Sequence, residues 1–298
     1  MEKSIFEENL SYIKYRKDIV YHYYQLLNKI PTRISRKIYK CTYFFCPPEL
    51  VDGLKNLEEK IINGDDLLPY LSRQIIDPTY RDHMLYDFGI VHFHLGTKLS
   101  KDNPLLLKST DELVYALIDN NLCYFITIDH HKKWNCVNLL STLKKDFPQV
   151  LDKWKIKGEP IYKIKNNERE ILIKNGINTW LEIDGEYYMS PGMGVNTAGT
   201  SMLAVMNMNR NFHYYMNLQD SISQWIRKNI NEVEKISGRK LLDMHLILQE
   251  IEPINIYEPN NNIYISIVNN GNVVIMEISG NHVEKETSNI IARKEFHL

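Results

Sequence analysis

Apolar residues near the start of the chain recur at spacings close to the helical period. Between positions 4 and 30 the pattern runs through Leu10, Ile13 and Leu26, and it stops at Pro31. Apolar positions three or four residues apart form one stripe on a helix, and proline interrupts a helix because it has no backbone N–H. We therefore expect one or two helices in this segment.

Strand and helix signals then alternate as far as Pro78. The aromatic run 39–45 favours a strand and is stopped by two prolines, of which Pro48 is well placed to open a helix over 49–62. An Asn-Gly pair ends that helix, and a second short helix is expected over 66–73.

Three segments typical of strands follow, at 84–95, 112–119 and 122–129. Two asparagines between the last two form a tight turn, which predicts an antiparallel hairpin. The amphipathic segment 133–143 then predicts a helix, which Pro148 closes.

The second half of the chain mixes both patterns. Thr200 or Ser201 is expected to cap a helix, because a hydroxyl oxygen accepts a hydrogen bond from the first-turn amides. The other expected elements are strands at 161–173 and 179–189, a helix at 220–235, and a hairpin formed by 263–268 and 273–278. We classify the fold as α+β, with N-terminal helices, an antiparallel sheet with flanking helices, and a second α+β domain.

The length of 298 residues exceeds the usual size of one domain, so we divide the chain into three parts. These are an N-terminal helical segment at 1–38, a domain with the candidate chemistry at 39–150, and an α+β domain at 151–298. The last is expected to bind substrate, a partner or a trigger.

Composition indicates an ordinary folded protein without strong overall charge. Hydrophobic residues make up 44% and charged residues 24%, and the net charge is −1, so only a local patch can attract nucleic acid or a membrane. Five basic residues and no acid lie between Lys29 and Lys40, either as a solvated helix end or as a phosphate-binding strip. The four cysteines lack the paired spacing of a zinc site, and the charged N-terminus has no apolar export segment. We expect reduced thiols, a cytoplasmic location and no membrane association.

Two histidines share one side of the strand expected at 84–95. Side chains alternate along a strand, so Phe93 faces the core while His92 and His94 point together to the opposite side. Nothing in the local pattern explains this pair as packing. The pair is therefore a candidate site.

Asp129, His130 and His131 follow directly on an apolar strand, where side chains can reach a ligand. Histidine titrates close to neutrality, so one imidazole can take a proton from a nucleophile while another gives a proton to a leaving group. RNA cleavage by its own 2′-hydroxyl requires this division of roles. The neighbours expected to stabilise phosphate charge and to stack on a base are Lys132, Lys133 and Trp134.

Residues 112–131, ELVYALIDNNLCYFITIDHH, resemble the penultimate hairpin of RelE-like toxins, which are small ribosome-associated messenger-RNA endonucleases. His92-Phe93-His94 is similar to the histidine-bearing strand of the YafQ-like branch. The resemblance covers about residues 39–148 and implies a strand, two helices and an antiparallel sheet. It also implies that His92 or His94 is the upstream catalytic histidine and that His130 or His131 is the C-terminal one. The chain departs from these compact toxins in its longer connection 96–111 and in its additional N-terminal and C-terminal parts.

These features predict a toxin-like or defence-associated endoribonuclease that works by metal-independent histidine acid/base catalysis. Its expected partners are RNA, the ribosome, and an antitoxin or a phage-derived trigger. The expected catalytic residues are His92, His94, His130, His131 and Asp129. The expected substrate-binding residues are Arg81, Tyr115, Lys132, Lys133 and Trp134.

Three alternatives stay open. The first is a metal-dependent nuclease or hydrolase, since His92, His94 and His130 also suit a divalent metal, because imidazoles two positions apart on a strand lie on one face. A non-catalytic RNA-binding or protein-binding regulator is a second alternative. The third is a nucleotide site at 190–201, where glycines and hydroxyl residues precede a helix and can present amides to an anion.

Overall fold

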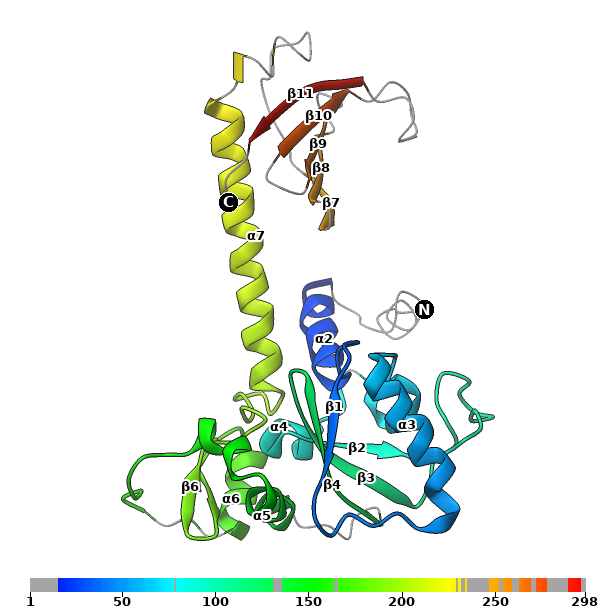
Figure 1. The fold of residues 1–298 in the computed structure, drawn as a ribbon. Helices are drawn as coiled ribbons and strands as arrows, with labels where there is room; N and C mark the ends of the chain where they lie inside the picture. The colour runs from blue at the N-terminus through cyan, green and yellow to red at the C-terminus, as the bar shows by residue number, and fades with distance from the viewer. Residues whose placement is uncertain are drawn as a thin grey trace. The chain divides into compact units, whose positions relative to one another are not determined.

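A computed structural model shows the arrangement of the chain (Figure 1). The described residues are 16–77, 79–130, 136–162, 164, 166–228, 230–231 and 234, together with five strands between Ile247 and Glu295. They form two compact units, Met1–Asn209 and Arg210–Leu298. Among the described residues, none of the helices is both long and apolar enough to cross a membrane.

The first unit begins with helix α2 (Arg16–Lys29) and strand β1 (Lys37–Lys40). A single 3₁₀ turn, Pro48–Leu50, leads into helix α3 (Val51–Asn63), as the proline signal predicts. Gly64 ends α3 with a φ of 74°, and its amide bonds back to the carbonyls of the last turn. A glycine suits this position because a Cβ atom there would lie 2.5 Å from the backbone nitrogen of Ser35, in the loop between α2 and β1.

Two sequence predictions between 66 and 95 need correction. Instead of one helix at 66–73, the chain forms two 3₁₀ turns, Leu68–Tyr70 and Arg73–Ile76. The strand expected at 84–95 is a short helix, α4 (His83–Phe88), followed by strand β2 (Ile90–His94). The side chain of Asp82 accepts the Leu85 N–H at 3.0 Å and caps α4, while Gly89, at φ 68°, ends it. These local signals override the apolar alternation that favours a strand.

The central sheet has the strand order β1-β4-β3-β2, where β3 is Glu112–Asp119 and β4 is Leu122–His130. The β3–β4 hairpin is antiparallel, as predicted, but β1 runs parallel to β4 and makes the sheet mixed. The direction of β1 follows from contacts at its start. The Lys37 amide donates to Asn121 O and the Arg36 guanidinium donates to Asn120 O, so β1 begins where β4 begins.

Two layers cover the sheet (Figure 1). On one face, α3 and the 3₁₀ turns bury a core that includes Leu57, Ile61, Phe93, Val114 and Phe125. On the other face lie helix α5 (Cys136–Asp146) and the hairpin of β5 (Leu181–Ile183) and β6 (Glu186–Tyr188). The core there includes Ile90, Leu113, Tyr115, Leu140, Leu181 and Ile183. Apolar burial on both faces stabilises the sheet.

The boundary between compact units lies at Asn209, which differs from the boundary expected near residue 150. The β5–β6 hairpin contributes to the same core as α5, so residues on both sides of position 150 pack together. The segment 161–173, expected to be a strand, contains helix α6 (Asn166–Lys174) instead. Arg169 and Ile173 are both buried, and side chains four apart share one face of a helix.

Helix α7 (Met202–Lys228) crosses into the second unit and is continuous, so the helix expected from 220 starts earlier. The Ser201 hydroxyl accepts the Ala204 N–H at 3.2 Å, which confirms the predicted cap. The second unit contains an antiparallel sheet in the order β11-β10-β9-β8-β7 and includes the expected β9–β10 hairpin. Its strands are β7 (Ile247–Ile251), β8 (Ile254–Glu258), β9 (Ile263–Val268), β10 (Asn272–Glu277) and β11 (Asn289–Glu295). Helices and sheets thus make the chain α+β.

Candidate functional site

The alternation predicted for β2 is present. Phe93 packs in the core under α3, whereas Ile90 packs in the core under α5. His92 and His94 are two and four positions after Ile90, so they lie on the α5 side of the sheet. Their ring centroids are 6.4 Å apart, at an interplanar angle of 74°. The two imidazoles are therefore neighbours, as the sequence predicts.

His94 is held firmly in place. Only 6% of its surface is exposed, and its Nδ1 lies 3.1 Å from the amide nitrogen and 3.2 Å from the carbonyl oxygen of Thr110. The Thr110 hydroxyl accepts the Leu95 N–H at 3.1 Å and donates to Glu112 O at 2.6 Å. This backbone cradle can accept the ring in either protonation state of Nδ1, because it offers one donor and one acceptor.

His92 is half-buried and lies against Tyr115 on the neighbouring strand, with the two ring centroids 6.3 Å apart. Tyr115 itself is fully buried, and its hydroxyl donates to the backbone carbonyl of His130 at 3.4 Å. Burial, together with the nearby charge of Asp129, raises the pKa of Tyr115 above its ordinary value. Tyr115 thus supports His92 from inside the core and does not offer the exposed substrate contact that the sequence predicts.

Asp129 and His130 point to opposite faces of β4. Asp129 pairs in register with Leu113, which belongs to the core under α5, so its side chain shares the face of His92. His130 pairs with Glu112 and lies on the other face, where its Nδ1 is 3.7 Å from a Glu112 oxygen. The expected cluster therefore divides. His92, His94 and Asp129 share one face, and His130 does not.

The alternative metal set does not assemble as expected, because His130 is on the far face of the sheet from the β2 pair. Within the described part of the chain, no three side chains of the His, Cys, Asp or Glu type gather as a metal site. Four further predicted residues lie outside the described residues, and they are His131, Lys132, Lys133 and Trp134.

Two charged residues upstream of β2, Arg81 and Asp87, are held by contacts within the protein. The exposed Arg81 packs its guanidinium against Gly199, where a Cβ atom would lie 2.6 Å from Nη1. Asp87 is buried in an ion pair with Arg169 and accepts the Ser190 hydroxyl at 2.6 Å. A partner-saturated carboxylate of this kind holds elements together and is not available to a substrate.

The glycine-rich segment 190–201 uses its amides within the protein. Gly192 donates to Asp87 O at 3.3 Å and Gly194 donates to Tyr86 O at 2.7 Å. These carbonyls belong to α4, whose C-terminal end needs donors. The segment therefore fastens α4, and the expected nucleotide site at this position is not formed by these amides.

The basic stretch from Lys29 to Lys40 is not a continuous solvent-facing strip either. Lys29 and Arg36 are only 1% and 4% exposed. Arg33 pairs with an aspartate and Lys40 with a glutamate, each at 2.7 Å. Both earlier interpretations of this stretch assume exposed cations, whereas two of the five are buried.

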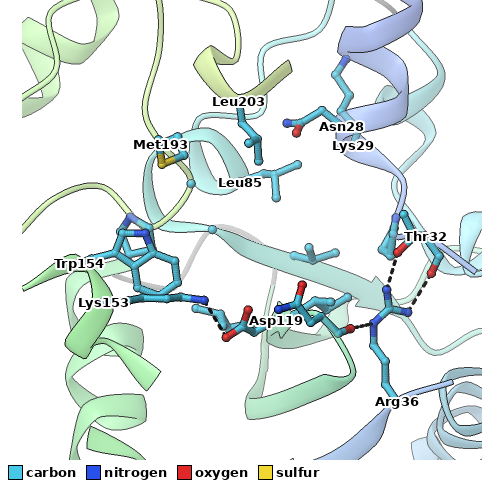
Figure 2. A pocket seen from close by; sticks show the side chains of 18 of the residues that line it. Asn28, Lys29, Thr32, Arg36, Leu85, Asp119, Lys153, Trp154, Met193 and Leu203 are labelled. Atoms are coloured by element: carbon cyan, nitrogen blue, oxygen red, sulfur yellow. Dashed lines mark hydrogen bonds and ion pairs between the residues drawn. The ribbon is translucent and has the colours of Figure 1, made fainter. Parts of the chain in front are cut away.

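A cavity of about 420 Å³ lies beside the other end of the β2–β3 ladder (Figure 2). It extends over Val91 at the start of β2 and over Leu117 and Asp119 at the end of β3. His94 pairs with Leu113 and His92 with Tyr115, four and two residues from Leu117, and neither histidine lines the cavity. The cavity and the histidine face are thus separate sites.

Comparisons with known proteins give no relative for this chain. No family model matches the chain, and no curated protein or solved structure shows a significant match.

Proposed function

We propose that this protein is an endoribonuclease whose reaction centre is the sheet face with His92, His94 and Asp129. One observation carries the proposal. The His92 ring, both of whose nitrogens are buried, lies beside a second imidazole held by the backbone, on the face that also bears the Asp129 carboxylate. Titratable groups gathered at one place are the usual basis of acid/base catalysis.

The chemistry assigns one role to each group. His92 takes the proton of a ribose 2′-hydroxyl, whose oxygen attacks the adjacent phosphorus. The bond from phosphorus to the 5′-oxygen breaks, and a general acid protonates that oxygen, which leaves a 2′,3′-cyclic phosphate and a free 5′-hydroxyl. Asp129 lies on the same face but on β4, two strands from β2, where it adds negative charge to the face, and His94 positions His92. His131 is the candidate acid from the sequence and lies outside the described residues.

RNA is proposed as the substrate because residues 39–148 resemble RelE-like toxins. The same resemblance suggests a cytoplasmic site of action, messenger RNA on the ribosome, and an antitoxin or phage-derived trigger as regulator. The antiparallel arrangement of β2, β3 and β4 supports this proposal, whereas the parallel β1 and the 3₁₀ turns after α3 depart from the fold that the resemblance implies.

Cleavage of a labelled RNA by the purified full-length protein, with and without translating ribosomes, tests the proposal. We expect His92→Ala to lower the cleavage rate about 100-fold or more. His213→Ala, which removes an exposed histidine of α7, is the matched control and should cleave like the wild type. EDTA should leave the rate unchanged. Intact RNA under both conditions, together with harmless expression in cells, would exclude the ribonuclease.

One observation favours the non-catalytic regulator as the second candidate. His94 and Tyr115 are buried, and His94 is bonded to the main chain, as structural side chains are. In that case the protein should bind RNA or a protein partner without cleaving RNA, and His92→Ala should lower thermal stability rather than any rate. The cleavage assay and a melting curve for the same variant separate these two functions.

A further inference from the structure

The cavity beside the β2–β3 ladder has the size and lining of a small-molecule site. Its volume of about 420 Å³ falls within the range of known ligand pockets. Its apolar wall is formed by Leu85, Val91, Leu117, Met193 and Leu203, and the indole of Trp154 adds an aromatic surface. This lining favours a ligand with a flat apolar part.

Positive charge exceeds negative charge around the cavity. Lys29, Arg36 and Lys153 line it together with one carboxylate, Asp119, which bonds to Lys153 at 2.7 Å. Among the described residues, neither Lys29 nor Arg36 has an acidic partner within ion-pair distance. Burying a cation without a counter-charge is unfavourable, and a bound anion would offset that cost.

Arg36 is the cation best placed to meet an anion. It is 96% buried, and all its bonds go to neutral oxygens: Nε to Asn120 O, Nη1 to Thr32 O and Ile34 O, and Nη2 to the Thr32 hydroxyl. A guanidinium has five N–H donors, so four such bonds leave one Nη2 N–H without an acceptor among the described residues. This donor belongs to a side chain that borders the cavity.

Lys29 supports the positive field from a different position. Its Nζ donates to Asp77 O at 2.8 Å and lies 5.5 Å from the centre of the Tyr80 ring. Burial lowers the pKa of Lys29 to about 8, despite the opposing charges of Asp77 and Asp82. Lys29 also lines the cavity.

The order of these groups across the cavity matches the order of parts in a nucleotide. In Figure 2, Trp154 and Arg36 stand on opposite sides of the space, and Asp119 lies between them at its base. An aromatic ring can stack on or against the indole, a carboxylate accepts hydrogen bonds from vicinal hydroxyls, and a guanidinium binds phosphate. Every ribonucleotide has its base, ribose and phosphate connected in this order.

We propose that this cavity binds a ribonucleoside monophosphate, with its base at Trp154, its ribose hydroxyls at Asp119 and its phosphate at Arg36. The site is distinct from the histidine face, because neither His92 nor His94 lines the cavity. The proposal therefore stands whether or not the protein is a ribonuclease.

Calorimetric titration of the full-length protein with AMP, GMP, CMP and UMP tests the proposal. We expect at least one nucleotide to bind with a Kd below about 1 mM and a stoichiometry of one. The corresponding nucleoside and inorganic phosphate should each bind about 10-fold or more weakly. The comparison of nucleotide with nucleoside reports on the phosphate contact without a change at Arg36, which also supports the fold.

Two variants locate the binding. Trp154→Leu should weaken binding about 10-fold, because base stacking is lost while an apolar side chain is kept. Asp119→Asn should reduce the preference for the ribonucleotide over its 2′-deoxy form about 10-fold. Phe45→Ala removes an aromatic side chain that is 70% exposed and does not line the cavity, so it should bind like the wild type.

Several results would overturn the proposal. They are the absence of binding by all four nucleotides, equal binding of nucleoside and nucleotide, and wild-type affinity in both cavity variants. Binding of a short oligoribonucleotide without binding of any mononucleotide would assign the surface to an RNA strand and would equally reject a mononucleotide site.

Discussion

Asp87 in α4 and Arg169 in α6 form a buried ion pair across 82 positions of the chain. Both guanidinium Nη atoms bond to the two carboxylate oxygens, and the Ser190 hydroxyl donates to the same carboxylate. The Arg169 guanidinium also lies 5.3 Å from the centre of the Phe88 ring. The pair thus joins α4, α6 and the segment after β6 at the point where the chain enters β2.

Removal of one partner from this pair should be strongly destabilising. Asp87→Ala leaves a buried guanidinium without its counter-charge, and we expect the free energy of unfolding to fall by about 3–5 kcal/mol. The exposed pair of Lys60 and Asp65 is the matched control, and Asp65→Asn should cost less than about 1 kcal/mol. Urea denaturation measures both. A similar cost for the two variants would show that Asp87 and Arg169 are not paired as described.

The Thr110 hydroxyl should stabilise the loop that cradles His94. Thr110→Val removes a hydroxyl that bonds to the Leu95 N–H and to Glu112 O, and we expect a loss of about 1–3 kcal/mol in the free energy of unfolding. Thr110→Ser keeps the hydroxyl and should retain most of the stability. Thermal melts of the two variants show whether the hydrogen bonds of the Thr110 hydroxyl or the packing of its methyl group stabilises the loop. Equal losses in valine and serine variants would assign the effect to the methyl group instead.

Stability should fall steeply at alkaline pH because of buried thiols. Burial raises the pKa of Cys41 and Cys123 from 9 to about 12, and it raises the pKa of Cys136 as well. Between pH 9 and 12 the folded thiols keep their protons while the unfolded thiols lose them, so unfolding releases protons and becomes more favourable as the pH rises. Stability from this source is complete below pH 9.

Lys29 has the opposite effect between about pH 8 and 10.5, because its lowered pKa makes the folded state lose the proton first. Three thiols outweigh one amine, so the net change is still a loss of stability with rising pH. Urea denaturation at pH 8.5, 9.5 and 10.5 measures it. Cys123→Ala should reduce the slope by about 0.7 kcal/mol per pH unit near pH 9 and by about 1.4 kcal/mol per pH unit above pH 10. An unchanged slope would mean that this thiol titrates normally in the fold.

Local signals predict much of the secondary structure. Pro48 and Gly64 bracket α3, a pair of asparagines joins β3 to β4, and Ser201 caps α7, each through a bond or a backbone angle set within a few residues. The same reasoning fails at 84–95 and 161–173. There, a cap at Asp82 and the buried i, i+4 pair of Arg169 and Ile173 decide for helices.

The sequence predicts only part of the candidate site. Alternation along β2 places His92 and His94 together, because the side-chain period of a strand is a local property. The same rule separates Asp129 from His130, although their adjacency suggests a single cluster. Whether a face is open or covered depends on α5 and the β5–β6 hairpin, and so the burial of Tyr115 could not be read from its own strand.

The sequence by itself determined the α+β class, the β3–β4 hairpin, the side of β2 that carries histidines and the starts of several helices. Only the tertiary structure decided the parallel direction of β1, the ion pair of Asp87 with Arg169, and a cavity that brings Arg36, Asp119 and Trp154 together. The physical reason is the range of the interactions. Periodicity and capping act within a few residues, whereas burial and charge pairing depend on segments that meet only after the chain has folded.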